Sequence, residues 1–345
     1  MAPPQAAQLQ QDQHAADQEQ QGNDRETTCS ASAYYAHWSG VRPDLLRLTL
    51  AAIRFDPEGA AERPLVLLAG DSSLDNKYWV PSDRATAVNG YERFLRPPSS
   101  REDVCHWLNA ALAERHGGRV ACVNGAVEAS TLAQRGDGRT LLPQDEAVRD
   151  ALRPCDALVV SVGGNDIALA PSAKTALCML ALMHCTSVAA LRQGKSCFYA
   201  HFVQLFRDKV ERYVAALTAK TKPRCVVICM IYYPCESAGQ ESWAAPMFRA
   251  LGYDASPQRL QAAIHAMCEH ATREVALEGT EVLALPLFNV LDAKDPNDYV
   301  ARVEPSSQGG RKIAGAILDL VMPLLLEPRS QAAGRAPPLA PLTQV

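Results

Sequence analysis

Short apolar runs alternate with helix-like patterns over most of this 345-residue chain. The runs predict five strands, at residues 64–69, 119–123, 156–162, 225–232 and 281–286. Residues 158–162 and 225–228 are rich in β-branched side chains, which is typical of strands buried on both faces. The patterns between and after the strands predict helices at residues 103–116, 143–152, 199–220, 257–277 and 307–326. Alternation of strands and helices indicates parallel βαβ units, so the expected fold is a three-layer α/β/α sandwich of about five parallel strands.

The two ends of the chain differ in composition from the part between them. Residues 1–33 are polar and rich in Gln and Ala, and residues 328–345 are rich in Pro and Ala. Such segments hold little that can be buried, so we expect disordered tails. The simplest organisation is one domain over residues 34–327.

Composition and charge narrow the class of protein. With 48% hydrophobic and 21% charged residues, the chain is typical of globular proteins. A formal net charge of −4 gives no general electrostatic reason to expect binding to nucleic acid or to an anionic membrane. No uninterrupted apolar stretch is long enough to span a membrane, and the N-terminus lacks a signal-peptide pattern, so we expect a cytoplasmic protein.

The 11 cysteines are expected to be reduced thiols, most of them buried. Cys178, His184, Cys185 and Cys197 lie close together in the sequence but lack C-x-x-C spacing. We therefore favour core cysteines over a metal site and expect neither a metal nor another cofactor.

Polar residues follow three of the predicted strands. Gly70-Asp71-Ser72-Ser73 ends the first, Asn124-Gly125-Ala126-Val127 the second and Gly163-Gly164-Asn165-Asp166 the third. Ligands of open α/β sheets bind at this edge, where the carboxyl ends of the strands meet. A serine hydroxyl, an Asn amide and free backbone N–H groups are the components of an acyl-transfer site. Each segment is also compatible with an ordinary turn that caps the next helix.

The order of these segments resembles the SGNH (GDSL-type) hydrolases, a family of esterases and lipases. Gly70-Asp71-Ser72 is similar to the family's nucleophile block, and residues 163–166 are similar to its Asn block. The resemblance implies a flavodoxin-like sandwich, Ser72 as nucleophile and an oxyanion held by the Ser72 N–H and the Asn165 amide. The glycine of the family's Gly block aligns best with Ala126, with Gly125 one position earlier, so the N–H of this segment is expected to be a third donor.

The chain departs from the family pattern in its last block. The family has Asp, two residues, then His-Pro-Ser, where this chain has Ala301, two residues, then Glu304-Pro305-Ser306. A free Glu is about two pKa units less basic than His, which corresponds to about 3 kcal/mol less driving force for deprotonating Ser72. Burial raises a carboxyl pKa and offsets that deficit. Glu304 is therefore the candidate base; capping of the last helix is an equally open interpretation.

Further polar residues are candidates for contact with a substrate. They are Asp71, Ser73, Lys77, Glu128, Gly164 and Asp166. Lys77 is also a candidate base, as in Ser–Lys pairs, although a solvated Lys77 is the simpler interpretation.

The leading hypothesis is a hydrolase that acts on a small-molecule ester, thioester or amide through Ser72. The alternative is a catalytically impaired binding protein of the same fold, for an acyl or glycan ligand, since the His and Asp are missing. A nucleotide-binding flavodoxin-like protein is disfavoured because G-x-x-x-x-G-K-[ST] and a G-x-G-x-x-G after the first strand are both absent.

Overall fold

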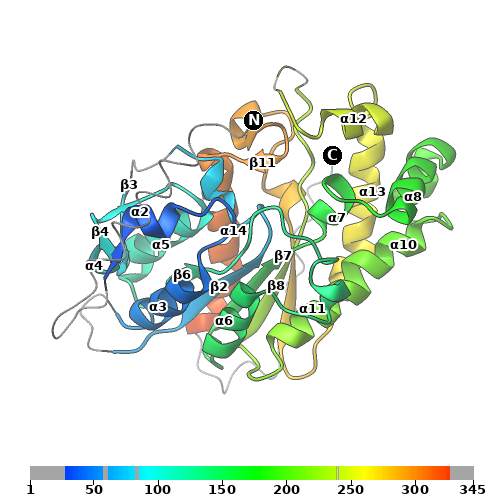
Figure 1. Ribbon diagram of the computed structural model, residues 1–345. Helices are drawn as coiled ribbons and strands as arrows, with labels where there is room; N and C mark the ends of the chain where they lie inside the picture. The colour runs from blue at the N-terminus through cyan, green and yellow to red at the C-terminus, as the bar shows by residue number, and fades with distance from the viewer. Residues whose placement is uncertain (1–27, 57–60, 82–84, 238, 240, 327–345) are drawn as a thin grey trace.

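A five-stranded parallel sheet forms the centre of the molecule (Figure 1). The computed structural model describes residues 28–56, 61–81, 85–237, 239 and 241–326. The strand order is β6-β2-β7-β8-β9 and every neighbouring pair is parallel. The strands are β2 (Leu65–Gly70), β6 (Ala121–Asn124), β7 (Ala157–Ser161), β8 (Cys225–Met230) and β9 (Glu281–Pro286).

Helices cover both faces of this sheet and make it a three-layer α/β/α sandwich (Figure 1). One layer contains α3 (Pro43–Ile53), α6 (Pro143–Ala151) and α11 (Val210–Leu217), which pack side by side. The other contains α5 (Val104–His116) and α14 (Ser307–Leu326), which pack on each other. Because β2, β6, β7 and β8 are buried over their whole length, both faces need apolar side chains, and the continuous apolar runs supply them.

A further group of helices lies beyond β7 and β8, at the right of Figure 1. It consists of α7 (Gly164–Ala168), α8 (Ala173–Cys185), α9 (Val188–Arg192), α10 (Tyr199–Val203), α12 (Ala245–Leu251) and α13 (Pro257–His270). Helix α13 packs against α9 and α10, and α8 packs against α10 and α12. These helices form one side of the site described below.

The predicted fold is confirmed, with differences in its helices. All five predicted strands are present, within three residues of the expected ends. The helix expected at residues 199–220 is interrupted by a π-helical turn over Gln204–Lys209, and the one expected at 257–277 ends at His270. Helices α3, α8, α9 and α12 were not predicted. Helices α9 and α12 are short, whereas α3 buries Leu46, Leu50 and Ile53 at helical spacing, a pattern that was missed.

The part of the chain that the structure describes begins within the segment that the sequence assigns to the N-terminal tail. β1 (Cys29–Ser30) pairs with β4 (Leu95–Arg96), and α2 (Ala31–Tyr35) buries Ala31 and both of its tyrosines. Residues 1–27 and 327–345, where the remainder of the two predicted tails falls, lie outside the described residues.

Seven of the 11 cysteines are buried. The interpretation of Cys178, Cys185 and Cys197 as core cysteines is wrong, because the first is only partly buried and the other two are exposed. Over the part of the chain that the structure describes, no helix has the length and apolar character needed to cross a membrane.

Candidate active site

Ser72 is presented by a sharp turn at the end of β2. Gly70 has a φ of +129°, and a Cβ at this position would lie 1.9 Å from the Ser161 carbonyl oxygen on β7. Only glycine fits this backbone, which then turns as the Asp71 N–H donates to the same carbonyl at 2.9 Å. The Asp71 carboxylate accepts from the Ser73 N–H at 3.1 Å and closes the turn around Ser72.

Asn165 is presented in a similar way at the end of β7. Gly163 has a φ of +101°, and a Cβ there would lie 2.8 Å from the Phe206 ring. The chain then enters α7, whose second residue is Asn165. The Asn165 amide donates to the Ser130 carbonyl at 3.0 Å, which fixes its orientation and leaves its second N–H for another acceptor.

Glu304 reaches the site from the far end of the chain. It forms the short strand β11 (Glu304–Pro305), which pairs antiparallel with β10 (Tyr299–Val300) immediately before α14. The preceding turn is anchored by Arg302, which is buried and donates to the Cys235 carbonyl at 3.1 Å and to Asp254 at 2.7 Å. One Glu304 carboxyl oxygen accepts from the Trp243 indole N–H at 3.3 Å.

These three segments line one pocket. Ser72, Asn165 and Glu304 share it with Asp71, Ser73 and Gly164, all six named in the sequence as candidate site residues. Ser72 and Asn165, 93 positions apart, share the pocket because parallel strands bring their carboxyl ends to the same edge of the sheet. Glu304, 139 positions further on, is brought there by the turn between β10 and β11.

The pocket gives Glu304 the basicity that a free glutamate lacks. Burial, with a smaller contribution from the charge of Asp71, raises the pKa of Glu304 from 4.5 to about 7, against the opposing effect of hydrogen-bonding groups on Ser72 and Trp243. That value is close to the pKa of about 6.5 for a free histidine. Oε2 of Glu304 is buried and has no hydrogen-bond partner among the described residues.

A second glutamate lies close enough to interact with the first. Burial, followed by the charge of Glu304, raises the pKa of Glu128 to about 9. Its Oε1 accepts from the Trp79 indole N–H at 2.9 Å, whereas its Oε2 is buried without a partner among the described residues. At neutral pH Glu128 is therefore uncharged, so it does not prevent Glu304 from ionising.

The expected role of Ala126 and Gly125 as oxyanion donors is wrong, because their N–H groups are already used. The Ala126 N–H donates to the Asn124 side chain at 2.9 Å, and the Gly125 N–H donates to the Leu68 carbonyl at 2.8 Å. Ala129 is the residue of this loop with an unused N–H: among the described residues neither it nor Ser72 has a backbone N–H partner. Ala129 has a φ of +59°, a conformation that favours glycine and that an alanine in a sequence does not reveal.

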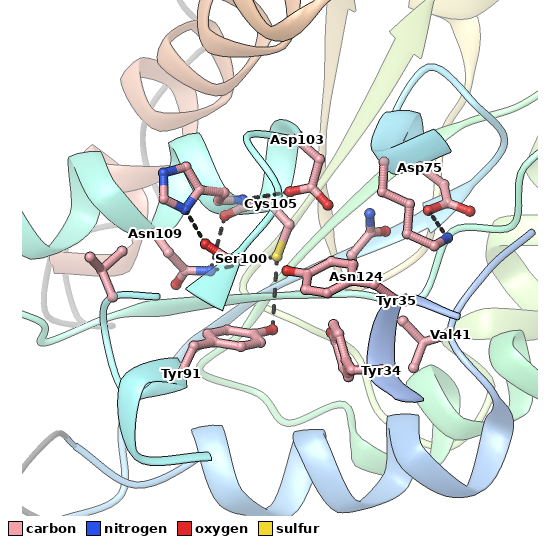
Figure 2. Close-up of a pocket in the computed structure, with 13 residues that line it drawn as sticks. Tyr34, Tyr35, Val41, Asp75, Tyr91, Ser100, Asp103, Cys105, Asn109 and Asn124 are labelled. Atoms are coloured by element: carbon pink, nitrogen blue, oxygen red, sulfur yellow. Dashed lines mark hydrogen bonds and ion pairs between the residues drawn. The ribbon is translucent and has the colours of Figure 1, made fainter. Parts of the chain in front are cut away.

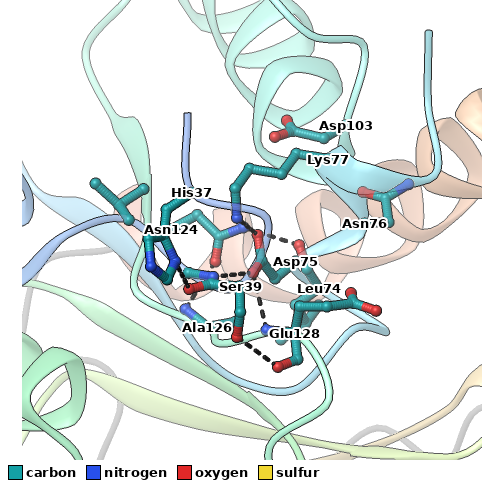
Figure 3. Close-up of polar contacts among 12 residues, drawn as sticks. His37, Ser39, Leu74, Asp75, Asn76, Lys77, Asp103, Asn124, Ala126 and Glu128 are labelled. Atoms are coloured by element: carbon teal, nitrogen blue, oxygen red, sulfur yellow. Dashed lines mark hydrogen bonds and ion pairs between the residues drawn. The ribbon is translucent and has the colours of Figure 1, made fainter. Parts of the chain in front are cut away.

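Lys77 does not reach the pocket that contains Ser72. Figure 3 shows its ammonium group turned toward Asp75, with which it forms an ion pair at 2.5 Å. The other Asp75 oxygen accepts from the N–H groups of Gly40 at 2.7 Å and Glu128 at 2.9 Å. Lys77 is 2% exposed, so both the solvated and the catalytic interpretations of this residue are wrong; it helps to hold the loop that carries Glu128.

A smaller cavity surrounds this ion pair and is shown in Figure 2. It has a volume of about 20 Å³ and is lined by Asp75, Lys77, Asp103 and several tyrosines. A cavity of this size holds about one water molecule. It is therefore part of the support of the site rather than a second substrate pocket.

Asn76 and Asp166 connect the loops of the site. The Asn76 amide donates to the Pro305 carbonyl at 3.0 Å, and its oxygen accepts from the Val104 N–H at 3.0 Å. The Asp166 carboxylate accepts from the N–H groups of Leu132 at 2.8 Å and Ala133 at 3.0 Å. Asp166 therefore fixes the loop that follows β6, and it is not among the residues that line the pocket.

Two residues important to this arrangement have no signal in the sequence. Arg135 is fully buried and donates to the Gly70 carbonyl at 3.2 Å, to Ser130 at 2.9 Å and to Asp145 at 2.8 Å. Trp243 reaches Glu304 from the segment before α12. Neither belongs to a motif, since each acts through contacts that only the fold creates.

The arrangement contains the groups that acyl transfer requires and no cluster of metal ligands. The Ser72 hydroxyl, a carboxylate of suitable basicity on Glu304 and the Asn165 amide line one pocket. Among the described residues, no three His, Cys, Asp or Glu side chains come together as metal ligands would.

Comparison with known proteins identifies the family of the chain. The model of the GDSL-like Lipase/Acylhydrolase family matches residues 68–312, which is more than half of the chain. The chain belongs to this family of hydrolases. No curated protein sequence matches it.

Solved structures with a similar fold include three bacterial or metagenomic enzymes. A lipase from a goat rumen metagenome has 11% identity and a TM-score of 0.45, covering 74% of this chain and 96% of its own. A putative GDSL-like lipase from Parabacteroides merdae has 13% identity and a TM-score of 0.40, covering 74% and 94%. A variant of an acetyl xylan esterase from Geobacillus stearothermophilus has 16% identity and a TM-score of 0.37, covering 74% and 93%. At these identities, and with TM-scores below 0.5, these structures do not indicate a substrate for this chain.

Proposed function

We propose that this protein hydrolyses esters by acyl transfer through Ser72, with Glu304 as the general base. The observation that carries the proposal is that Ser72, Asn165 and Glu304 line one pocket. A carboxylate with a pKa near 7 is half ionised at neutral pH, where a general base is most effective. Glu304 therefore takes the place of a histidine without the loss of driving force expected for a free glutamate.

The proposed reaction has two stages. In the first, the Glu304 carboxylate takes the proton of the Ser72 hydroxyl as its oxygen attacks the ester carbonyl carbon. The tetrahedral oxyanion accepts hydrogen bonds from the N–H groups of Ser72 and Ala129 and from the Asn165 amide. The C–O bond to the alcohol then breaks, and the alcohol leaves with the proton held by Glu304.

In the second stage, water hydrolyses the acyl group attached to Ser72. Glu304 takes a proton from the water as it attacks the acyl carbon, and the same three donors hold the second oxyanion. Collapse of this intermediate releases the carboxylic acid and returns the proton to Ser72. A carboxylate has no tautomers, so Glu304 needs no Asp partner, which is consistent with Ala301 at the position of that Asp.

The test is labelling and turnover with matched variants. We expect the purified protein to hydrolyse short-chain 4-nitrophenyl esters and to form a Ser72 adduct with a fluorophosphonate probe. Ser72→Ala is expected to abolish both, whereas Ser306→Ala, in the exposed turn before α14, is expected to retain both. Absence of turnover and of an adduct between pH 6 and 9 would refute the hydrolase. Ligand binding without turnover would then favour the alternative, a binding protein of the same fold.

A further inference from the structure

The pocket beside Ser72 extends into an apolar cavity between helices. Helix α8 contributes Met179, α12 contributes Met247 and Leu251, and α13 contributes Leu260 and Ile264. The whole pocket, including the part beside Ser72, has a volume of about 90 Å³. Trp243 is 37% exposed and lies where the cavity meets solvent, so one end is open and the helices close the other.

Apart from the reacting groups, the polar side chains that line the pocket are those of Asp71, Ser73, Tyr232 and Trp243, and none of them lies on α8, α12 or α13. The Tyr232 hydroxyl donates to the Val303 carbonyl at 2.6 Å, and the Trp243 indole N–H donates to Glu304. The side chains contributed by α8, α12 and α13 are all aliphatic or thioether groups. A sugar hydroxyl or an amide placed among them would lose its hydrogen bonds to water and gain none from these side chains. A hydrocarbon chain has no hydrogen bonds to lose there, and its transfer out of water is favourable.

The volume of the cavity indicates the length of that chain. An engineered apolar cavity of about 150 Å³ holds a benzene molecule. At about 90 Å³ for the whole pocket, the enclosed space holds fewer than six carbons but more than the single methyl group of an acetyl ester. Further carbons extend along the open end toward Trp243.

We propose that this cavity binds the hydrocarbon tail of the acyl group, so that the protein prefers esters of four- to eight-carbon fatty acids over acetyl esters. This inference rests on the proposed function of Ser72 and names its substrate class. It assigns chain-length selectivity to α8, α12 and α13, which are outside the turns that carry the reacting groups. The remaining part of the substrate, the alcohol, occupies the solvent side.

The first experiment measures kcat/KM for 4-nitrophenyl esters of two, four, six, eight and twelve carbons. Burying one methylene group is worth about a fourfold gain in kcat/KM, so the value is expected to rise from two to six carbons and to fall at twelve. Ile264→Phe fills the cavity and is expected to lower the ratio of hexanoate to acetate activity at least tenfold. Leu260→Ala widens it and is expected to move the optimum to a longer chain.

Leu177→Phe is the matched control for an added aromatic ring. Leu177 lies on α8 but is 67% exposed and does not line the cavity, so the chain-length profile is expected to stay unchanged. Equal rates for acetate and hexanoate esters in the unmodified protein would overturn the proposal while leaving the hydrolase intact. An unchanged profile in both Ile264→Phe and Leu260→Ala, each verified as folded, would also overturn it.

A binding measurement separates this proposal from the catalytic one. Ser72→Ala with hexanamide is expected to show a higher melting temperature than with acetamide at the same concentration, because hexanamide fills the cavity. If no ester is hydrolysed but hexanamide stabilises the variant, the acyl cavity stands and the hydrolase fails. If hexanamide and acetamide have the same effect, the cavity does not bind the chain.

Discussion

Replacement of Glu304 by Gln is expected to increase stability at alkaline pH while it removes activity. The folded-state pKa of Glu304 is about 7, compared with 4.5 for an unperturbed glutamate, because burial disfavours the ionised carboxyl. Since the folded pKa is the higher one, the neutral form stabilises the fold fully below pH 4.5. That contribution is lost as the pH rises through 7.

The expected change in unfolding free energy follows from the size of the pKa shift of Glu304. A difference of about 2.5 pKa units corresponds to about 3 kcal/mol, at about 1.36 kcal/mol per unit. Gln has the shape of the neutral acid and does not ionise. The difference in unfolding free energy between Glu304→Gln and the unmodified protein is therefore expected to grow by about 2 to 3 kcal/mol from pH 5 to pH 8 in favour of the variant. Loss of the Glu304 charge also lowers the pKa of Glu128, which acts in the same direction.

Urea denaturation at pH 5, 6, 7 and 8 measures this difference, and Glu114→Gln on the exposed face of α5 is the matched control. An unpaired Gln amide would shift the unfolding free energy of the variant by the same amount at every pH, so that shift cancels when the difference is compared across pH. The same protein samples give the activity, which is expected to fall about 100-fold to 10,000-fold in Glu304→Gln. In the unmodified protein kcat/KM is expected to rise with pH and level off above about pH 7. A stability difference that does not vary with pH would refute the reasoning, since it would mean that Glu304 does not titrate as a buried acid.

Three other substitutions test the support of the site. Asn165→Ala removes an oxyanion donor and is expected to lower kcat about 100-fold to 1,000-fold, measured on a 4-nitrophenyl ester; an unchanged kcat would exclude it from the oxyanion site. Gly70→Ala places a Cβ 1.9 Å from the Ser161 carbonyl oxygen, so we expect at least about 3 kcal/mol of destabilisation or loss of folded protein, measured by thermal unfolding. Arg135→Leu leaves a buried carboxylate unpaired and is expected to destabilise by about 3 to 5 kcal/mol, whereas Arg149→Ala, whose ion pairs are on the surface, is expected to cost less than about 1 kcal/mol; equal effects would contradict this account.

Much of the fold is encoded in local patterns that can be read along the chain. Strands buried on both faces require continuous apolar runs, and β2, β7 and β8 have them, so their positions were predicted closely. Because strands of one parallel sheet end at one edge, the sequence also predicted that Ser72 and Asn165 would meet, and both line the same pocket. Glu304 was a candidate base because the Pro-Ser frame after it resembles the last block of the family, and it lines the same pocket.

Local sequence patterns do not predict the role of a residue that acts through contacts with residues distant in the sequence. The residues around Lys77 do not reveal whether its side chain is solvated or buried. Its ion pair with Asp75 forms only because the loop packs as it does. Nothing in the sequence distinguishes Ala129, yet its N–H has no partner among the described residues, and we propose it as the oxyanion donor in place of Ala126.

The chemistry of Glu304 is likewise a property of the tertiary structure. The sequence alone determined that a carboxyl group stands where the family pattern has a histidine. Its pKa depends on the fold, because that value is set by how completely Trp243, the turn around Ser72 and helices α8, α12 and α13 exclude water from it. Composition and periodicity specify which groups a chain carries and which strands it forms, whereas the free energy of charging a buried group depends on the surroundings that folding brings to it.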